Sequence, residues 1–393
     1  MNALIAQCGG PTAVINASLA AVVRAWQAIP KHGKLWGARL GMQGLVQRNW
    51  ADLTDLPPSA LAQLAEQPGA ALGSARYRPT EEELAAVLEH LREAQVTALF
   101  LVGGNGTMAA AQYLGELAAA RSQPLQVIGI PKTVDNDLAG TDVTPGYGSV
   151  ARYIAQTTLE VALDLRAMRG FEHVVLMEVM GRHAGWIAAA AALARAHVED
   201  LPQLILLPER PKDVEVILQQ IAEVHRTAGI CLLVTAEGAR DQQGNYLAER
   251  LGSAGADDSG QRIFSMSAGV SAYLGGLVQN VLGLRCRQVR PNTIQRASAA
   301  LASTVDRELA ALAGSTAVAL YTQGTTGVMV SLRRDGSEEG SWRTDHVNVG
   351  DVIGRERLLP DAYVAASGLD VTPAFLDYAR TVAGPLPPAP LLF

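Results

Sequence analysis

Short apolar runs alternate with helix-length stretches along most of the chain. Each run is bounded by turn residues, which is typical of buried strands. Strands separated by helix-length segments predict an α/β fold, with a mostly parallel sheet and right-handed crossovers. The predicted strands cover residues 3–6, 34–38, 98–102, 126–130, 173–179, 204–207, 230–235, 284–288 and 317–321.

A helix is predicted directly after the first strand. Pro11 fits its first position, where a missing N–H costs nothing. One apolar face then repeats at helical spacing, through Ile15, Leu19, Val22 and Trp26.

A second amphipathic helix is predicted over 80–92. Thr80 is the expected N-cap, and Glu83 stands three residues later, as a capping box requires. The longest apolar stretch, AGWIAAAAALA, ends before Arg195. It is too short to span a bilayer and predicts a buried helix, so no membrane partner is expected.

Length and charge narrow the class of protein. A chain of 393 residues suggests two or three domains. The net charge is −6 and no Lys/Arg run is present, which argues against a nucleic-acid partner. The N-terminus MNALIAQCGG lacks a signal peptide, and the three scattered cysteines show no metal spacing. We therefore expect a cytoplasmic protein.

Two glycine turns follow predicted strands. Gly9 and Gly10 come after the first strand, and LVGGNGTM, residues 101–108, ends another strand and opens a helix. Bare backbone at a helix N-terminus suits a phosphate. One glycine pair alone is more often a plain tight turn, but two such turns favour a phosphate site between them. Neither turn is a dinucleotide fingerprint, so a nicotinamide oxidoreductase is disfavoured.

The stretch PKTVDNDL, residues 131–138, combines a cation with two acids. Asp135 and Asp137 alternate, so in an extended segment both would point to one side. A divalent cation or a shared proton relieves their repulsion, and Lys132 supplies charge for a polyanion. The alternative is an Asx-turn loop with a solvated lysine.

A fourth stretch, MEVMGRHAGW, residues 177–186, runs from a buried strand into a helix. Arg182 stands where a phosphate or a carboxylate would bind. His183 could act as a base, although a histidine at a helix start is more often a cap or a supporting group.

Together these stretches resemble the phosphofructokinase family, most closely its pyrophosphate-dependent branch. The match follows family order over nearly the whole chain and includes LGSAR (72–76), TAEGA (235–239), RPNTIQR (290–296) and the segment LPDAYV…GLDVTPAFLDYAR. The resemblance implies Mg²⁺-dependent phosphoryl transfer to the 1-hydroxyl of fructose 6-phosphate, as a reversible step of glycolysis.

The resemblance also implies residue roles. Asp135 would be the general base, with Thr133 beside it, and Arg76 would bridge the donor and acceptor phosphates. Asp137 and Asn105 would hold Mg²⁺. The donor would be bound by Gly9, Gly10, Gly104, Asn105, Gly106, Thr107 and Lys132, and the sugar phosphate by Thr133, Asp135, Asp137, His173, Met180, Gly181, Arg182, Glu237, Arg287 and Arg296.

Arg287 aligns with an arginine that in the family reaches the sugar phosphate from a neighbouring subunit. The resemblance therefore implies a homodimer or homotetramer. His173 stands where relatives can have an arginine that crosses the subunit interface. Thr293 replaces a sugar-binding histidine, so a longer phosphosugar such as sedoheptulose 7-phosphate stays open as an acceptor.

The phosphoryl donor is left with two alternatives. Lys132 is typical of pyrophosphate users, and Met42 replaces an aromatic that ATP users place near the adenine. Gly106 is typical of ATP users. We expect pyrophosphate, with ATP as the alternative. Asn105, in place of a metal-binding aspartate, is the one feature that favours a third reading, a non-catalytic regulatory subunit that binds phosphosugars.

The expected fold has two doubly wound, mostly parallel α/β domains with the active site in the cleft. The donor domain is expected over 1–143 plus 296–341. The sugar-phosphate domain is expected over 144–295 plus 342–393, including a C-terminal tail.

Overall fold

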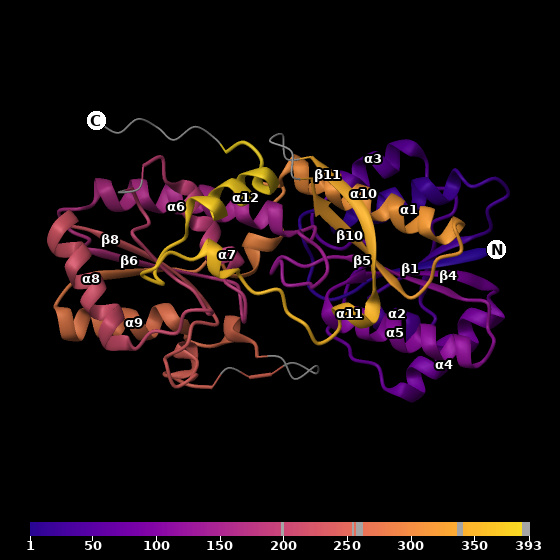
Figure 1. The fold of residues 1–393 in the computed structure, drawn as a ribbon, viewed down its shortest axis with the longest axis horizontal. Helices are drawn as coiled ribbons and strands as arrows, with labels where there is room; N and C mark the ends of the chain where they lie inside the picture. Colours follow the sequence, from indigo (N-terminus) through magenta and orange to yellow (C-terminus); the bar gives the residue numbers. More distant parts are fainter. Residues whose placement is uncertain (198–199, 254, 257–261, 336–340, 387–393) are drawn as a thin grey trace. The chain divides into compact units, whose positions relative to one another are not determined.

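The computed structural model describes all residues except 198–199, 254, 257–261, 336–340 and 387–393. The chain forms two compact units, Met1–Ser149 with Arg296–Arg357, and Val150–Gln295 with Leu358–Phe393. Unit 1 is the first of these and unit 2 the second (Figure 1). The sequence places two of the crossings earlier, after residues 143 and 341. The last crossing follows 357 because the strand over 342–348 pairs along its length within unit 1.

Unit 1 contains a seven-stranded sheet of order β11-β10-β5-β4-β1-β2-β3. Its inner strands are parallel, and β3 and β11 are antiparallel edges. The predicted α/β class and the mostly parallel sheet are confirmed. The strands are β1 (Asn2–Gln7), β2 (Leu35–Ala38), β3 (Trp50–Asp52), β4 (Val96–Gly103), β5 (Gln126–Pro131), β10 (Val328–Arg334) and β11 (Trp342–Asn348).

The strand predicted over 317–321 is wrong. These residues form the last turns of α10 (Thr304–Thr322). A five-residue apolar run fits a buried helix as well as a strand, and the small residues before it continue the helical face. The sequence analysis also missed β3, β10 and β11. In β11 the side chains are mostly exposed, so the strand has no apolar run from which it could be predicted.

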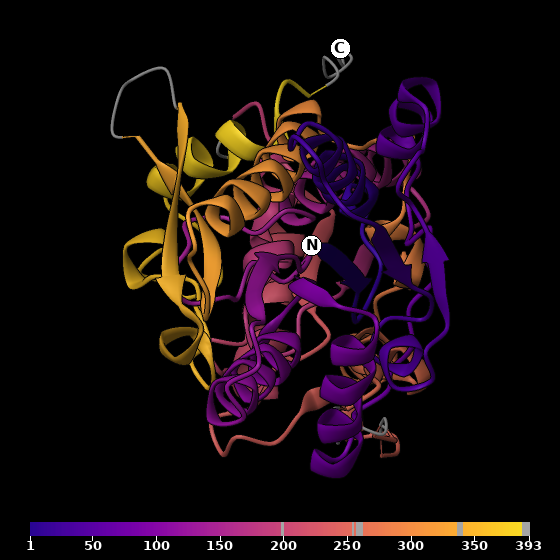
Figure 2. The same cartoon turned by 90° about the vertical axis from the view of Figure 1, so that its right-hand side faces the viewer.

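Helices cover both faces of this sheet (Figure 2). One face packs against α1 (Ile15–Gln27), α3 (Pro58–Glu66) and α10, around the rings of Trp26 and Phe100, whose centroids lie 6.4 Å apart. The other face packs against α2 (Met42–Val46), α4 (Glu81–Glu93), α5 (Asn105–Ala120) and α11 (Val349–Val352).

The predicted N-termini of two helices, α1 and α4, can be compared with the structure. Pro11 is not the first residue of α1, which begins at Ile15. The hydroxyl of Thr12 accepts the N–H of Val14 at 3.2 Å, and this local turn delays the helix. The capping box of α4 is confirmed, because Thr80 Oγ1 accepts the N–H of Glu83 at 3.2 Å and Glu83 Oε2 accepts that of Thr80 at 2.8 Å.

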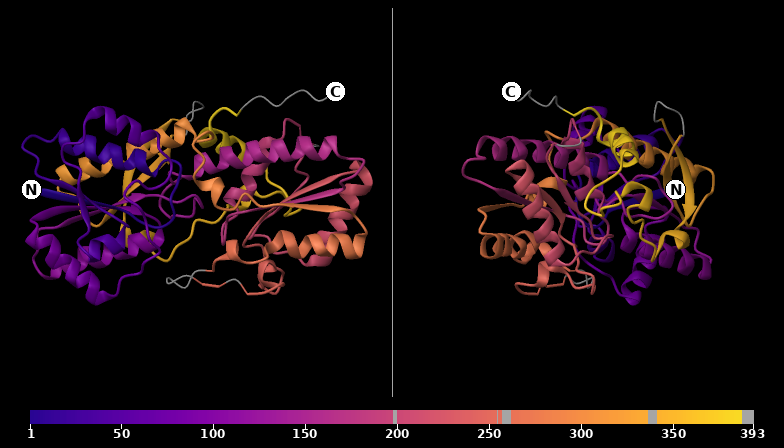
Figure 3. Two further views of the ribbon diagram at one scale, coloured as in Figure 1. Left: turned by 180° about the vertical axis from the view of Figure 1, so that it is seen from behind. Right: turned by 60° about the vertical axis from the view of Figure 1, so that its left-hand side comes forward.

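Unit 2 contains a four-stranded parallel sheet of order β7-β8-β6-β9. Its strands, β6 (Val174–Val179), β7 (Leu204–Leu206), β8 (Cys231–Ala236) and β9 (Cys286–Val289), all overlap predicted strands. One face packs on α8 (Val214–Ala228) and α9 (Gly269–Leu282). The other lies against α6 (Tyr147–Ala167) and α7 (Trp186–Ala189) (Figure 3). α12 (Pro373–Ala383) packs on α7 through Tyr378 and Trp186.

The alanine-rich stretch that follows Gly185 is buried, as predicted, but it divides between α7 and the 3₁₀ helix η1 (Ala190–Ala194). Over the described part of the chain, no helix combines the length and the apolar character needed to cross a membrane. The remaining short helices are η2 (Leu247–Glu249), η3 (Phe264–Met266), η4 (Asn292–Arg296) and η5 (Asp361–Tyr363).

Candidate active site

The two glycine turns of unit 1 leave the same edge of the sheet. β1 and β4 are parallel neighbours, so the turns after Gln7 and Gly103 lie at adjacent carboxyl ends. From β1 the chain goes to β2 on one side, whereas β4 and β5 lie on the other. The direction of winding thus reverses between β1 and β4, and such switch points are where open α/β sheets bind ligands.

The first turn lies against two cations. Gly9 has a φ of +74°, and a Cβ there would lie 3.2 Å from Lys132 Nζ. A Cβ on Gly10 would lie 3.0 Å from Arg296 Nη1. Lys132 Nζ donates a hydrogen bond to the Gly10 carbonyl at 2.8 Å, and Ser74 Oγ donates to that of Gly9 at 2.5 Å. Glycine at both positions therefore leaves room for the cations.

The second turn opens α5. Gly104 is the N-cap residue, and its carbonyl accepts the N–H groups of Thr107 and Met108. Gly106 is exposed, and a Cβ there would meet nothing within 4 Å. Asn105 Oδ1 is buried without a hydrogen-bond partner in the described structure. A free acceptor and open space therefore lie together at the start of this helix.

Lys132 follows β5 and is only 4% exposed. Burial lowers the pKa of its ammonium to about 8, and the charge of Arg296 acts in the same direction. Cys8, Asp135 and Asp137 oppose this shift. Burial raises the pKa of the Cys8 thiol to about 12, so Cys8 stays protonated. Lys132 is therefore a charged group held in a dry site, where a bound anion would stabilise it.

The loop that carries the two aspartates is not extended, so the basis for placing both on one side is wrong. Residues 134 and 135 form a bend, and Asn136 has a φ of +55°. Asn136 is fully buried and its Oδ1 accepts the N–H of Thr144 at 3.0 Å. The sequence alone does not predict this conformation, because it depends on the contact of Asn136 with Thr144, eight residues later.

Further contacts fix this loop. The N–H of Asp135 donates to Thr133 Oγ1 at 3.1 Å, and Thr144 Oγ1 donates to the Thr133 carbonyl at 3.0 Å. The N–H of Arg357 donates to the carbonyl of Asp137 at 2.7 Å. Asp135 and Asp137 themselves are half-buried. The predicted carboxylates are therefore presented by a loop whose backbone is tied down on both sides.

Asp306, which the sequence analysis missed, supports the next turn. Its carboxylate is fully buried and accepts from the N–H groups of Gly146 and Ser149, each at 2.9 Å, and from Ser149 Oγ at 2.6 Å. Burial raises the pKa of this carboxyl. Gly146 forms a parallel bridge with Thr133. By holding Gly146, Asp306 therefore stabilises the backbone that pairs with the aspartate loop. The sequence feature that could have indicated Asp306 is Ser303, three residues earlier. Ser303 is the N-cap of α10, and its side chain accepts the N–H of Asp306.

Arg76 lies on the segment that follows Ser74, whose hydroxyl contacts Gly9. Its side chain is exposed. Met42, expected near a nucleotide base, is instead 6% exposed and packs in the apolar cluster that includes Cys8 and Leu45.

In unit 2, the carboxyl ends of β6, β8 and β9 meet at one pocket. Met180 and Glu237, both predicted to bind sugar, line it. Met180 N–H donates to Gln295 Oε1 at 3.2 Å, and Gly181 has a φ of +124°. The other lining residues, which the sequence analysis did not assign, are Glu178, Val179, Arg290, Asn292 and Gln295.

Glu178 and Arg290 form an ion pair in this pocket. Glu178 is 3% exposed, and its Oε1 lies 3.2 Å from Arg290 Nη2. Glu178 Oε2 accepts the N–H and the hydroxyl of Ser271 at 2.9 and 2.8 Å. Both residues lie inside stretches that carried the resemblance, MEVMGR and RPNTIQR. Their position in these motifs could have indicated that they belong to the sugar pocket.

His173 and Arg287 do not join Met180 and Glu237. They lie at the amino end of β6, where Arg287 pairs with Val175. The six residues of β6 separate the two ends by about 20 Å. Arg287 is ion-paired with Asp164 and Glu172. The His173 ring lies 5.1 Å from that of His225, and burial, followed by the charge of His173, lowers the pKa of His225.

Arg182 and His183 follow Gly181. Arg182 is half-buried, and a Cβ on Gly238 would lie 1.7 Å from its carbonyl oxygen, so the two backbones are in close contact. His183 is exposed. Arg296, predicted to bind the sugar phosphate, lies beside Gly10 in unit 1.

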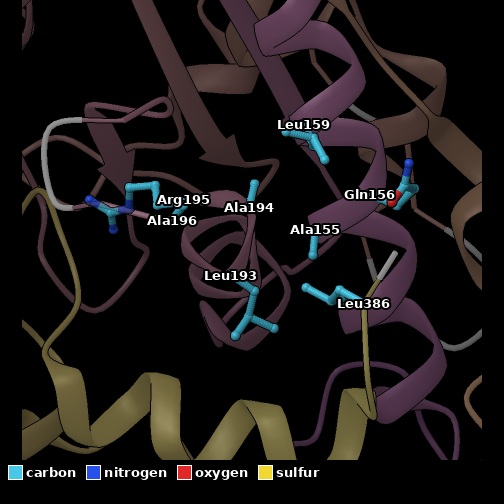
Figure 4. Close-up of a pocket in the computed structure, with 8 residues that line it drawn as sticks. All are labelled: Ala155, Gln156, Leu159, Leu193, Ala194, Arg195, Ala196 and Leu386. Atoms are coloured by element: carbon cyan, nitrogen blue, oxygen red, sulfur yellow. The ribbon is translucent and has the colours of Figure 1, made fainter. Parts of the chain in front are cut away.

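A separate hollow of unit 2 contains no predicted site residue (Figure 4). The hollow is mainly apolar and is lined by Ala155, Gln156, Leu159, Leu193, Ala194, Arg195, Ala196 and Leu386.

Among the described residues, no group of three or more His, Cys, Asp or Glu side chains is arranged to hold a metal.

This chain is similar to known proteins along most of its length. The phosphofructokinase family model matches residues 2–321. A pyrophosphate–fructose 6-phosphate 1-phosphotransferase of Xanthomonas campestris pv. campestris is 37% identical, over 98% of this chain and 91% of that protein. A sulfofructose kinase of Alkalicoccus urumqiensis is 36% identical, over 93% and 92% of the two chains.

An ATP-dependent 6-phosphofructokinase 3 of Streptomyces coelicolor is 32% identical, over 91% of this chain and 96% of that protein. Among solved structures, a pyrophosphate-dependent phosphofructokinase from Marinobacter aquaeolei matches with a TM-score of 0.87 and 34% identity, covering 98% of this chain and 93% of that one. With its fold, its glycine turns and its aspartate loop in family order, the chain belongs to the phosphofructokinase family.

Proposed function

We propose that this protein is a phosphotransferase that moves a phosphoryl group from pyrophosphate to the 1-hydroxyl of fructose 6-phosphate, giving fructose 1,6-bisphosphate. The observation that carries the proposal is the position of Lys132. Its ammonium lies against Gly9 and Gly10 at the β1–β4 switch point, where it would neutralise the terminal phosphate of a short donor. The pyrophosphate-dependent relatives support the same donor.

The chemistry requires positioning and charge neutralisation more than covalent catalysis. Asp135 would accept the proton of the 1-hydroxyl as the oxygen attacks phosphorus. Lys132 and Arg76 would stabilise the charge on the transferred group. The tied backbone of the aspartate loop supports this role, because a base contributes only when it is held in reach of its proton.

The residues near the donor turns fit a Mg²⁺ ion. Asn105 Oδ1 is a buried acceptor without a partner, and Asp137 supplies a carboxylate. Mg²⁺ is commonly bound by one or two protein oxygens together with substrate phosphates and water. Asn105 and Asp137 would hold the ion, which when bound would neutralise phosphate charge.

The pocket in unit 2 would bind the sugar. Glu237 is 8% exposed and offers a carboxylate to sugar hydroxyls, and Met180 offers an apolar wall. Arg290 brings a cation to the same pocket. The relative named as a sulfofructose kinase makes a sugar with a sulfonate in place of the phosphate a second acceptor to test.

ATP is the alternative donor, and the open space around Gly106 favours it. Initial rates with fructose 6-phosphate and Mg²⁺ should be measured with pyrophosphate and with ATP, and again with 6-deoxy-6-sulfofructose as acceptor. We expect turnover with pyrophosphate and fructose 6-phosphate. Turnover with ATP alone would overturn the donor assignment. Inactivity with every pair, in folded protein, would support a regulatory phosphosugar-binding subunit.

We also propose that the enzyme works as a homo-oligomer in which Arg287 and His173 serve the sugar site of a neighbouring copy. Their place at the amino end of β6, about 20 Å from Met180, supports this, because one chain cannot bring them to its own pocket. The three free cysteines fit the reducing cytoplasm in which we propose that it acts, in reversible glycolytic flux.

Mixing two variants tests the role of Arg287. Arg287→Ala should raise the KM for fructose 6-phosphate about 10- to 100-fold, since a charged hydrogen bond to phosphate is lost. Asp135→Asn alone should be nearly inactive. Hybrids of the two, formed by unfolding and refolding together, should regain activity, because some sites then contain both wild-type residues. A mixture no more active than its parts, or a monomer in sedimentation, would contradict the proposal.

A further inference from the structure

We propose that Glu178 and Arg290 are positioning residues of the sugar pocket of unit 2. As an ion pair they hold the walls of this pocket in place, and neither binds the sugar phosphate itself. This role rests on the proposed function, which assigns the pocket to the sugar. Met180 and Glu237, both predicted to bind the sugar, line the same pocket as the pair.

The terminal nitrogens of Arg290 already have acceptors within the protein. Nη1 donates to the carbonyls of Ser267 and Ala268, at 3.0 and 3.1 Å. Nη2 donates to the carbonyl of Phe264 and to Glu178 Oε1, each at 3.2 Å. Each of these nitrogens carries two hydrogens and makes two hydrogen bonds. A phosphate could reach them only by displacing protein acceptors, so the contacts suit a residue that holds backbone rather than a phosphate ligand.

Glu178 holds the start of α9. The N-cap residue of this helix, Ala268, offers no side chain to the first turn. Glu178 Oε2, which comes from β6, accepts the N–H and the hydroxyl of Ser271 instead, at 2.9 and 2.8 Å. A carboxylate at a helix N-terminus is stabilised by the helix dipole. Gly269 has a φ of +84°, and a Cβ there would lie 2.9 Å from Arg290 Cζ, so glycine lets α9 begin directly on the ion pair.

The pair also joins two walls of the pocket. Glu178 precedes Met180 by two residues, and Arg290 precedes Asn292 by two. The N–H of Met180 donates to Gln295 Oε1 at 3.2 Å, and Gln295 Nε2 donates to the carbonyl of Asn292 at 2.6 Å. The ion pair therefore fixes the end of β6 against the segment that follows β9, at the place where these two segments line the pocket.

The charge of the pair distinguishes positioning from direct binding. The Glu178 side chain is 2% exposed, and loss of one partner of a buried ion pair leaves an uncompensated charge. Without Arg290, the carboxylates of Glu178 and Glu237 would both face the pocket and repel an anionic sugar phosphate. Replacing both partners by amides removes the uncompensated charge. A positioning pair is therefore rescued by the second substitution, whereas a phosphate ligand is not.

Steady-state kinetics of single and double variants test the inference. Arg290→Gln should raise the KM for fructose 6-phosphate about 10- to 100-fold, with the KM for pyrophosphate within about threefold. Adding Glu178→Gln should return the KM for fructose 6-phosphate to within about fivefold of wild type. Arg195→Gln is the matched control, because it breaks a largely buried pair with Asp370 in unit 2, outside the pocket. It should lower stability and leave both KM values unchanged.

Ser271→Ala is a milder variant that keeps both charges. Ser271 lies outside the lining of the pocket, and the substitution removes only its hydroxyl bond to Glu178. We expect a folded protein with wild-type kcat and a KM for fructose 6-phosphate raised about two- to fivefold, the effect of one hydrogen bond. An unchanged KM in this variant would contradict the positioning role.

A double variant as impaired as Arg290→Gln alone would overturn the inference, because it would make Arg290 itself the phosphate ligand. Calorimetric titration of the wild-type protein with fructose 6-phosphate separates this outcome from failure of the proposed function. Wild-type protein that neither binds nor converts fructose 6-phosphate would overturn the proposed acceptor, and the inference with it. Wild-type activity with an unrescued double variant would overturn the inference alone.

Discussion

Replacing Asp135 by Asn lowers the turnover number about 10²- to 10⁴-fold, the range that a positioned general base contributes. The change is isosteric, and the backbone N–H of residue 135 still donates to Thr133 Oγ1. The sugar should therefore bind almost as before, with a KM for fructose 6-phosphate within a few-fold of the wild-type value. A loss confined to turnover is what removal of an interaction made only in the transition state predicts.

Steady-state rates over a range of both substrates provide the measurement. Asp142→Asn is the matched control, because Asp142 lies in the same unit, is partly exposed and pairs with Arg333. That variant should keep wild-type turnover. If Asp135→Asn retains more than about a tenth of the turnover, or if only its KM rises, Asp135 is not the base.

The arrangement of the site was predictable to the extent that it follows from parallel strands. The strands over 3–6, 98–102 and 126–130 were predicted to belong to a mostly parallel sheet, so their carboxyl ends were expected at one edge. The structure makes β1, β4 and β5 neighbours in that sheet. The turn at Gly9, the turn at Gly104 and Lys132 all follow such ends, so their proximity needs no long-range contact beyond the sheet itself. The same reasoning accounts for Met180 and Glu237, at the ends of β6 and β8.

The parts that were missed depend on contacts between distant segments. Asp306 acts on Gly146 and Ser149, which precede it by more than 150 residues, and no local pattern links them. Asn136 adopts a left-handed conformation because its side chain is held by Thr144, not because asparagine requires it. The contact of Arg296 with the Gly10 turn likewise depends on where the chain returns to unit 1, which spacing along the sequence does not determine.

Replacing Lys132 by Met should abolish most pyrophosphate turnover and at the same time stabilise the free protein. The folded state lowers the pKa of Lys132 from 10.5 to about 8, chiefly through burial. Below pH 8 lysine is protonated in both states, and the shift corresponds to about 3 kcal/mol of destabilisation. Methionine removes that cost and loses one hydrogen bond to the Gly10 carbonyl, worth about 1 kcal/mol. A net gain of about 2 kcal/mol follows.

The pH dependence distinguishes this cause from better packing. Between pH 8 and 10.5 the unfolded wild-type chain binds more protons at this lysine than the folded one, so wild-type stability contributed by this group rises with pH. The advantage of Lys132→Met should therefore shrink in urea unfolding at pH 9.5 compared with pH 7. Lys34→Met, at an exposed lysine paired with Asp52, should change stability by less than about 1 kcal/mol at either pH.

The same group sets an upper limit on the pH at which the wild-type enzyme captures its donor. Lys132 faces Cys8, Asp135, Asp137 and Arg296, and of these groups only Arg296 favours loss of the Lys132 proton. As pH rises through about 8, the free enzyme loses the ammonium, and kcat/KM for pyrophosphate should fall while that of Lys132→Met stays low and flat. A wild-type profile without this limb, or a less stable Lys132→Met protein at pH 7, would show that Lys132 is not the buried cation of the donor site.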